Sequence, residues 1–424
     1  MIEVRYPQIK INIEKIEIEP DIKILLSERP WSNTVDVFGS FNIGSFIENM
    51  DNAGITNFTN MMILRGTRYR TARKIIEDIE SLGSSIEFIT HYERTFFSIR
   101  CLRSNFKKTI YKIFKYARNA VFPENQVELV RGIISTAIDE SEQYPFRVAE
   151  KNFRKILFPK NHPLHREIIG YKNTIKKIKR DSINKHFKKY YSANNMIIGI
   201  CGGVDKNIVK KTFKEILSDW SGIEIKYSFP KVEKPSKKVS REIEMPGKSE
   251  ARIRVGSIAV PYSFNRECIA LSLVDNALGR FGLMGRLGKK IRDEAGLAYS
   301  VWSNIAWSKN YGYWMINAGV NPRNIEKALK MIYSELDEIS SKGITEEELK
   351  RVKNNTIGSL ITRLEENSYV ARLLHSIEYY NLGLDYFEKI RKMVEGISLK
   401  DCRKVAEKHY QKERSVEVIV KPKK

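Results

Sequence analysis

The chain has 424 residues, of which 42% are hydrophobic, and a formal net charge of +23 at pH 7. This length exceeds what one ordinary hydrophobic core organises, so we expect two or more domains. No apolar run approaches the length of a membrane span, and the N-terminus lacks the basic and apolar segments of a secretory signal, so we expect a cytoplasmic protein.

The predicted elements of the first half set a pattern of strands followed by helices. Apolar and β-forming residues predict strands at residues 35–41, 85–90, 95–102 and 196–201. Amphipathic periodicity predicts helices at residues 106–121 and 182–191. A further helix begins near Pro123, because proline suits the first turn of a helix.

The second half repeats this pattern, so the chain has a period of roughly half its length. Strands are predicted at residues 251–260, 298–307, 312–320 and 415–420, and helices at residues 323–339 and 399–410. Thr345 and Glu348 form a capping box, in which each side chain satisfies an exposed amide at a helix start.

The repeat predicts an α+β protein with two homologous domains in tandem, each a largely antiparallel sheet packed with helices. We place the N-terminal domain at residues 1–218, a linker at residues 219–250 and the C-terminal domain at residues 251–424. The linker holds three prolines and many lysines without a sustained period, so we expect an extended, partly exposed course.

Residues 54–67 combine a leading glycine, a short apolar helix and an Arg-Gly-Thr tail. This frame resembles the active-site helix of the pitrilysin/insulinase family of zinc metallopeptidases. In its inverted His-x-x-Glu-His motif, two imidazoles bind zinc and a carboxylate takes a proton from the bound water. The three motif positions here are Asn57, Asn60 and Met61. An amide is a weak neutral donor and a thioether suits Cu(I), so neither replaces these groups.

The family's third zinc ligand is a glutamate from a later helix, which residues 129–140 resemble. The ligand position falls on Ala137, which coordinates nothing. Asp139 and Glu140 could be shifted substitutes, but no histidine pair completes a site, and we interpret Glu140 as a solvated helix charge. The resemblance therefore implies a helix retained for packing, with a degenerate zinc motif and no metal on this chain.

Residues 285–301 resemble the family's Arg-Glu-x-x-Gly-Leu-Ala-Tyr-Ser segment. The resemblance implies that Arg292 and Tyr299 bind substrate near the scissile bond, since both can donate to a carbonyl oxygen that becomes an oxyanion. The alternative makes Arg292 a surface charge and Tyr299 a packed strand residue. The preceding residues 279–285 resemble a glycine-rich loop, either a turn or a mobile contact for peptide.

Other positions argue against a complete peptidase site on this chain. Glu87 and Phe88 stand where active members usually carry Asn-Ala on the substrate-pairing edge strand, which argues against strand addition here. No histidine has a second ligand at metal spacing; the six are His91, His162, His165, His186, His375 and His409. The cysteines are scattered without a Cys-x-x-Cys pair, so we expect reduced structural thiols at positions 101, 201, 268 and 402.

The positive charge is spread through nearly every predicted helix and is not gathered on an aromatic-interleaved platform. This positive charge favours an acidic partner subunit or an acidic peptide substrate over a nucleic acid. The hypothesis of a basic nucleic-acid-binding protein rests on charge alone.

The resemblance covers essentially the whole chain and implies half-size subunits that face each other like a clamshell. We therefore expect a non-catalytic subunit of a heterodimeric zinc metallopeptidase. A homologous zinc-binding subunit would supply the metal, and Arg292 and Tyr299 would act on the peptide in trans. The alternative is a catalytically inert structural or peptide-binding homologue, an assembly core or carrier, for which the kept Arg292 and Tyr299 have no evident use.

Overall fold

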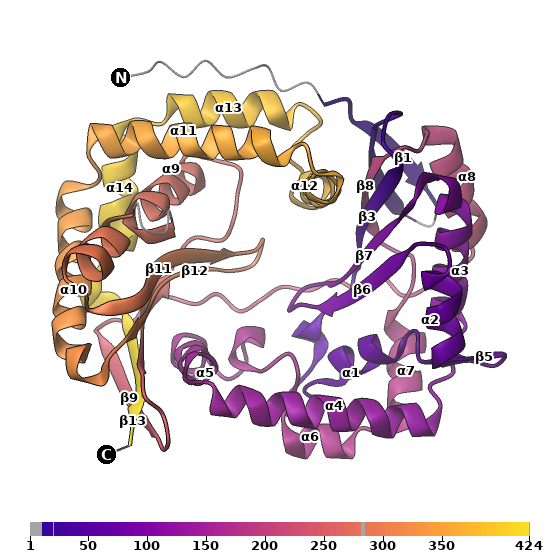
Figure 1. Ribbon diagram of the computed structural model, residues 1–424, viewed down its shortest axis with the longest axis horizontal. Helices are drawn as coiled ribbons and strands as arrows, with labels where there is room; N and C mark the ends of the chain where they lie inside the picture. Colours follow the sequence, from indigo (N-terminus) through magenta and orange to yellow (C-terminus); the bar gives the residue numbers. More distant parts are fainter. Residues whose placement is uncertain (1–10, 20, 281–284, 424) are drawn as a thin grey trace.

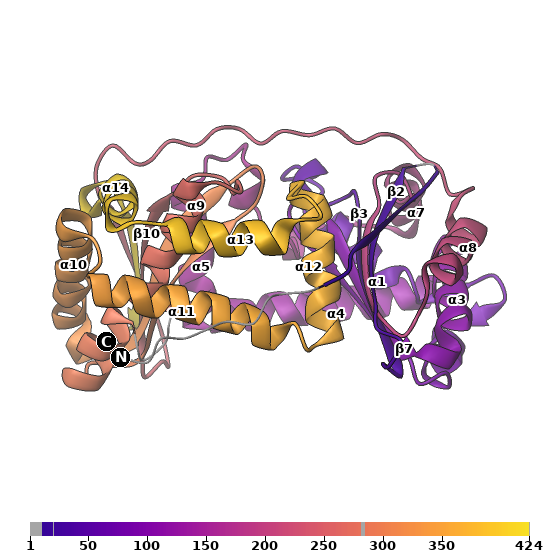
Figure 2. The same cartoon turned by 90° about the horizontal axis from the view of Figure 1, so that it is seen from above.

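The computed structural model describes residues 11–19, 21–280 and 285–423, which form two lobes (Figure 1). Each lobe is built on one sheet, and helices cover its outer face. The lobes lie at opposite ends of the molecule, and long helices run between them (Figure 2). Part of the predicted glycine-rich loop, residues 281–284, lies outside the described residues.

The sheet of the first lobe has the strand order β1-β2-β8-β3-β7-β6. Its neighbouring strands are antiparallel except for β2 and β8, which run parallel. Its central strand β8 is buried along its whole length, which explains its continuous apolar and glycine sequence. The strands are β1 (Glu14–Ile18), β2 (Ile22–Glu28), β3 (Thr34–Phe41), β6 (Ser85–Thr90), β7 (Thr95–Leu102) and β8 (Ile197–Gly202).

The sheet of the second lobe repeats this topology. Its order is β11-β12-β10-β13-β9, and only β13 and β9 run parallel. Reversed, this order matches β2-β8-β3-β7-β6 strand for strand, so the predicted α+β fold of two homologous, largely antiparallel domains is confirmed. The strands are β9 (Val239–Met245), β10 (Ala251–Ile258), β11 (Ala298–Trp307), β12 (Gly312–Val320) and β13 (Val416–Pro422).

The helices follow the repeat as well. The first half contains α1 (Ile55–Met62), α2 (Ala72–Glu80), α3 (Phe106–Arg118), α4 (Glu124–Gln143), α5 (Pro145–Leu157), α6 (Lys172–Lys177), α7 (Arg180–Tyr190) and α8 (Lys206–Leu217). The second half contains α9 (Arg266–Asp275), α10 (Ile325–Lys342), α11 (Glu346–Arg363), α12 (Asn367–Tyr380), α13 (Tyr386–Gly396) and α14 (Leu399–His409). The predicted capping box of Thr345 and Glu348 begins α11. None of the described helices combines the length and apolar content of a membrane span.

Two helices cover the sheet of the opposite lobe. The second-half helix α12 packs on β8, β3 and β2, where Leu374 shares a buried cluster with Leu25 and Cys201. The first-half helix α5 packs on β13 and β10, where Phe153 shares a buried cluster with Val418. The halves that the repeat predicts as separate domains are therefore interlocked by a symmetric exchange of helices.

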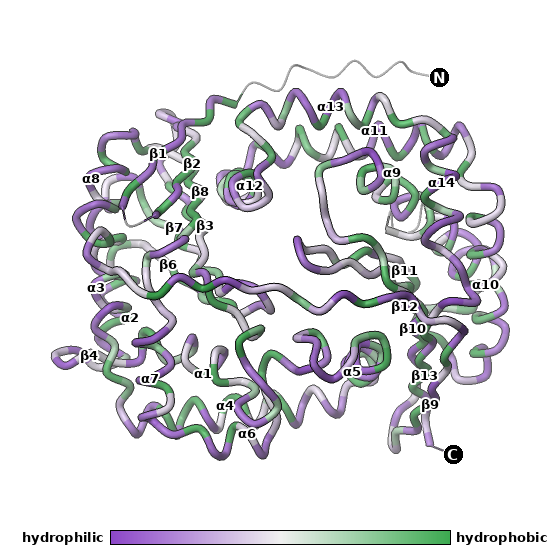
Figure 3. Tube along the Cα trace, turned by 180° about the vertical axis from the view of Figure 1, so that it is seen from behind, coloured by the Kyte–Doolittle hydropathy of each residue, from purple (hydrophilic) through white to green (hydrophobic). Residues whose placement is uncertain are grey.

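The segment predicted as a linker is shorter than residues 219–250. Residues 219–238 cross between the lobes without regular structure, as Figure 3 shows from behind. From Val239 the chain forms β9, which pairs with β13 and is the counterpart of β2. The prediction missed this strand because its side chains are mostly exposed and polar, so no apolar alternation marks it.

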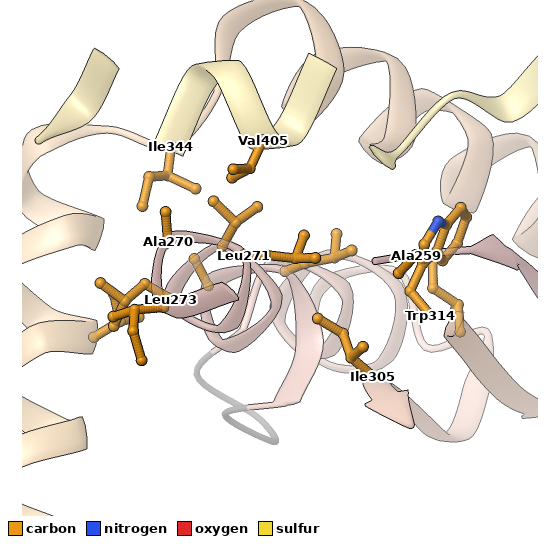
Figure 4. Close-up of a cluster of buried hydrophobic side chains, with 14 of the residues drawn as sticks. Ala259, Ala270, Leu271, Leu273, Ile305, Trp314, Ile344 and Val405 are labelled. Carbon is orange, nitrogen blue, oxygen red and sulfur yellow. The ribbon is translucent and has the colours of Figure 1, made fainter. Parts of the chain in front are cut away.

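The core of the second lobe is organised around α9, which is buried on nearly all sides. Figure 4 shows Ala270, Leu271 and Leu273 of this helix between Ile344 and Val405 on one side and strand β11 on the other. Such a helix has no polar face and is typical of a protein interior.

A buried polar junction joins the two hairpin tips to α12. Glu93, between β6 and β7, accepts hydrogen bonds from Ser308 and Asn310, between β11 and β12, and from Tyr379 of α12 at 2.9 Å. Beside it, Arg94 Nε donates to Ser40 Oγ at 2.6 Å. Since buried polar groups are costly when unpaired, these bonds fix how the lobes meet.

Candidate functional site

The helix α1 begins at a position that requires glycine. Gly54 has φ +95°, and a Cβ there would lie 2.9 Å from the Cα of Gly170 and 2.7 Å from Ile175 Cδ1. The carboxylate of Glu48 accepts hydrogen bonds from the amides of Gly54 and Thr56, each at 2.8 Å. The leading glycine of the motif frame and this carboxylate together hold the start of α1.

The degenerate motif positions lie where a zinc-binding helix would present its ligands. Asn57 and Met61 are one turn apart and half-buried, with Asn57 Nδ2 3.8 Å from Met61 Sδ. Asn60 is 3% exposed, and its Oδ1 has no hydrogen-bond partner among the described residues. This set offers one thioether and two neutral amides, without an imidazole or carboxylate.

The helix α4 packs against α1, as the resemblance implies for the third ligand. Ala137 lies on this helix with an exposed side chain that has no donor atom. Asp139, the shifted substitute, forms an ion pair with Lys172 of α6, and Glu140 is exposed. The structure therefore brings the two helices together but not a set of metal ligands.

The residues present do not fit a zinc ion. Within residues 11–19, 21–280 and 285–423, no group of three or more His, Cys, Asp or Glu side chains could hold a metal. Two of the histidines have polar partners within the chain: His162 Nδ1 accepts from the Leu164 amide at 3.1 Å, and His375 Nε2 lies 2.7 Å from Ser40 Oγ. Burial lowers the pKa of His162 to about 4, so this ring stays neutral near pH 7.

The second candidate segment, residues 285–301, consists of a π-helical turn, a glycine reversal and the start of a strand. Its π-helical turn, Gly288–Glu294, carries Arg292 and is anchored by the buried Ile291, whose carbonyl accepts from the Leu297 amide at 2.9 Å. The chain then reverses at Gly296, with φ +62°, and enters β11. π-Helical turns are rare and occur often at functional sites.

Arg292 and Tyr299 both point away from this anchored core. Arg292 is exposed and Tyr299 is 65% exposed. Tyr299 falls where the pairing of β11 with β12 shifts register, between Ala298 and Ser300. Such a bulge redirects a side chain that regular pairing would place on the sheet. In the described part of the chain, neither side chain forms a hydrogen bond or ion pair, so the packed-strand interpretation of Tyr299 is wrong.

The two candidate regions belong to different lobes. α1 lies beside the first sheet, and β11 forms the edge of the second sheet (Figure 1). On the first sheet, the matching edge strand β6 carries Glu87 with its side chain exposed and Phe88 facing Phe97. Within one chain the Arg292 and Tyr299 pair is therefore not assembled with the degenerate zinc motif.

Two family models of peptidases match this chain, one on each side of residues 172–176. The family model described as insulinase (peptidase family M16) matches residues 23–171. The family model described as peptidase M16 inactive domain matches residues 177–356. An uncharacterized zinc protease of Streptomyces coelicolor is 25% identical over 77% of this chain and 71% of its own length. One of Bacillus subtilis is also 25% identical, over 85% of this chain and 87% of its own.

The fold is also found among solved structures. The crystal structure of a peptidase M16 inactive domain from Pseudomonas fluorescens superposes with a TM-score of 0.88 and 21% identity, over 98% of this chain and 99% of its own. This likeness establishes the two-lobed fold. With a model of the same family on each half, the chain belongs to the insulinase, or M16, family of peptidases.

Proposed function

We propose that this chain is a non-catalytic subunit of a heterodimeric zinc metallopeptidase of the cytoplasm. A homologous partner subunit would bind the zinc ion, and the two chains would enclose short peptides or unfolded segments. In this assembly, Arg292 and Tyr299 would bind the peptide and stabilise the charge of the transition state at the partner's zinc site.

The observation that carries this proposal is the contrast between the two candidate regions. The α1 and α4 positions have lost every metal-binding group, whereas Arg292 and Tyr299 are held outward by a π-helical turn and a bulge, without partners among the described residues. A guanidinium and a phenol kept free in this way can donate hydrogen bonds to an oxyanion. A subunit that only packed would gain nothing from leaving both donors unpaired.

The partner is required because the chemistry is divided. Relatives of this chain are named zinc proteases, yet its own donor set does not fit zinc. A second, zinc-binding subunit reconciles the two facts. The net charge of +23 favours a partner surface or peptide that carries acidic groups.

Metal and activity measurements on the purified chain make the first test. Alone, it should contain no stoichiometric zinc and cleave no peptide, and activity should require the homologous zinc-binding subunit. Zinc content by mass spectrometry and cleavage of a fluorogenic peptide library report the two properties. Stoichiometric zinc together with cleavage by the isolated chain would overturn the proposal.

Substitutions in the active complex make the second test. Arg292→Ala or Tyr299→Phe should each lower turnover by roughly 100-fold, the usual effect of removing one oxyanion donor. Gel filtration should find the subunits still associated. Arg323→Ala and Tyr69→Phe are matched controls at exposed positions and should leave turnover unchanged. Normal turnover in both Arg292 and Tyr299 variants would instead favour an inert carrier or assembly core.

A further inference from the structure

A cavity of about 910 Å³ lies where the first sheet meets the loop between α11 and α12, and its lining includes no residue of either candidate region. One wall comes from β2, β3 and the turn between them, and includes Ser27, Trp31 and Asp36. The other comes from the end of α11 and the first turn of α12, and includes Leu364 and Asn367. Its volume lies within the range of small-molecule sites.

Asp36 is a buried acidic side chain of this cavity, and its carboxylate has no hydrogen-bond donor among the described residues. The residue is 6% exposed, and no described group donates a hydrogen bond to its carboxylate; Oδ2 is fully buried. Arg100 Nε lies 3.9 Å from Oδ1, which is too far for a hydrogen bond. Burial raises the pKa of Asp36 against the opposing charges of Arg100 and Arg372. An unpaired buried carboxylate of this kind can accept a hydrogen bond from a donor in the cavity, through Oδ1 because Oδ2 has no accessible surface.

The other charges around the cavity favour a ligand with a positive group. Four carboxylates line it, those of Glu28, Asp36, Glu365 and Glu366, against the two guanidiniums of Arg29 and Arg100. Arg29 is already occupied, since its guanidinium donates to the carbonyls of Leu364 and Glu365 and to Asn367 Oδ1. This acidic balance stands out in a chain with a net charge of +23.

An aromatic side chain supplies a second feature that suits a cation. Trp31 lines the cavity and is 78% exposed, and an indole face attracts an ammonium group.

The first turn of α12 offers hydrogen-bond donors on the other wall of the cavity. The N-cap residue Glu366 makes no side-chain cap, and the first amides of a helix have no partners within it. The donors at this end are backbone amides, which can bind a ligand carboxylate beside the side chains of Glu365 and Glu366.

We propose that this cavity binds a small zwitterion, an amino acid or short peptide with free termini. Its ammonium group would pair with Asp36 beside Trp31, and its carboxylate would lie toward the first turn of α12. The cavity lies wholly on this chain, so the proposal does not depend on a partner subunit or on zinc.

Calorimetric titration of the full chain with trialanine, N-acetyl-trialanine and trialanine amide tests the proposal. Trialanine should bind, and acetylation of its amine should weaken binding about tenfold or more, as expected for loss of a charge-assisted hydrogen bond. The amide, which lacks the carboxylate, should bind a few-fold more weakly than trialanine. Equal or tighter binding of the amide would mean a plain cation site and would overturn the zwitterion.

Substitutions locate the binding in this cavity. Asp36→Asn should weaken trialanine about tenfold or more but leave N-acetyl-trialanine unchanged, because the two changes remove the same contact. Trp31→Ala should weaken trialanine a few-fold, while the matched Tyr69→Ala should have no effect.

The Asp36→Asn chain should also melt no lower than the native chain, since the substitution removes an unpaired buried charge. A binding defect therefore cannot be traced to misfolding. The proposal fails if trialanine does not bind, if acetylation makes no difference, or if Asp36→Asn binds trialanine with native affinity.

Discussion

At the scale of single residues, Glu48 decides how α1 is held. The residue is buried, and burial raises the pKa of Glu48 to about 7, despite hydrogen bonds from the amides of Gly54 and Thr56 that oppose the shift. The ionised carboxylate is thus kept in the interior at a cost, next to the helix that carries the degenerate zinc motif.

The raised pKa of Glu48 makes stability depend on pH. The folded chain holds this proton up to about pH 7, whereas the unfolded chain releases it near the ordinary value of 4.5. Stability from this group is therefore fully present below pH 4.5 and is lost as the pH rises to about 7. Between pH 4.5 and about 7, the native chain should therefore lose about 3 kcal/mol of its free energy of unfolding relative to the Glu48→Gln variant, which has no carboxylate to ionise.

Urea denaturation at a series of pH values measures this difference. Glutamine has the shape and neutrality of the protonated carboxyl group, so the two chains should be closest near pH 4.5. The exposed Glu80→Gln is the control and should show no comparable change. A difference between Glu48→Gln and the native chain that is independent of pH would contradict the assignment.

The candidate site was only partly predictable at this scale. Asn57, Asn60 and Met61 could be placed because the frame around them is local in sequence. The lack of any metal-ligating group among them could also be read directly. Glu48 could not be predicted, because it lies six residues before Gly54 and reaches the helix only through the tertiary fold. The cavity of Asp36 and Trp31 could not be predicted either, because its opposite wall comes from the second half of the chain.

At the scale of elements, two glycines permit the exchange of helices. A Cβ on Gly199 of β8 would lie less than 2.5 Å from the Ala371 carbonyl oxygen of α12. A Cβ on Gly256 of β10 would lie 2.8 Å from Phe153 of α5. Each glycine lets the helix of the other half approach its sheet, but the two lie on strands that are not counterparts, since β8 corresponds to β13 and β10 to β3.

Gly199→Ala should separate α12 from the first sheet. The added methyl group meets main-chain atoms that cannot rotate away, so unfolding should become easier by about 2 kcal/mol or more. Gly132→Ala is the matched control: this glycine lies on the exposed face of α4 with no atom within 4 Å of an added Cβ. It should stabilise the chain by about 0.5–1 kcal/mol. Equal effects of the two substitutions in thermal and urea melts would rule out the close approach.

The elements themselves were largely predictable, but their pairing was not. Apolar and β-forming residues predict β3, β7 and β12, and the Thr345 capping box predicts the start of α11. The polar edge strand β9 carried no such pattern and was assigned to the linker. The amphipathic sequences of α5 and α12 indicate that each covers an apolar surface, but periodicity does not say which sheet supplies it.

At the scale of the whole molecule, the exchange makes each lobe depend on the other half of the chain. Without α12, the first sheet would expose Phe38 and Phe96, which now pack against His375. Without α5, the second sheet would expose the surface that Phe153 covers. The junction around Glu93 would also lose its partners in α12 and the β11–β12 turn. The lobes should therefore fold as one cooperative unit.

Dividing the chain within the connection tests this dependence. Residues 236–238 are exposed and have no regular structure up to β9, so a break after residue 237 removes no strand or helix. The two pieces, 1–237 and 238–424, should associate when produced together, because α5 and α12 hold them without a covalent link. The pair should elute as one species and melt in a single transition. Each piece alone should lack fixed tertiary structure by near-ultraviolet circular dichroism, since its sheet has an uncovered apolar face. Native-like spectra from either piece alone, or two separate transitions from the pair, would mean that the lobes are independent domains. The exchanged helices would then not be required for either lobe to fold.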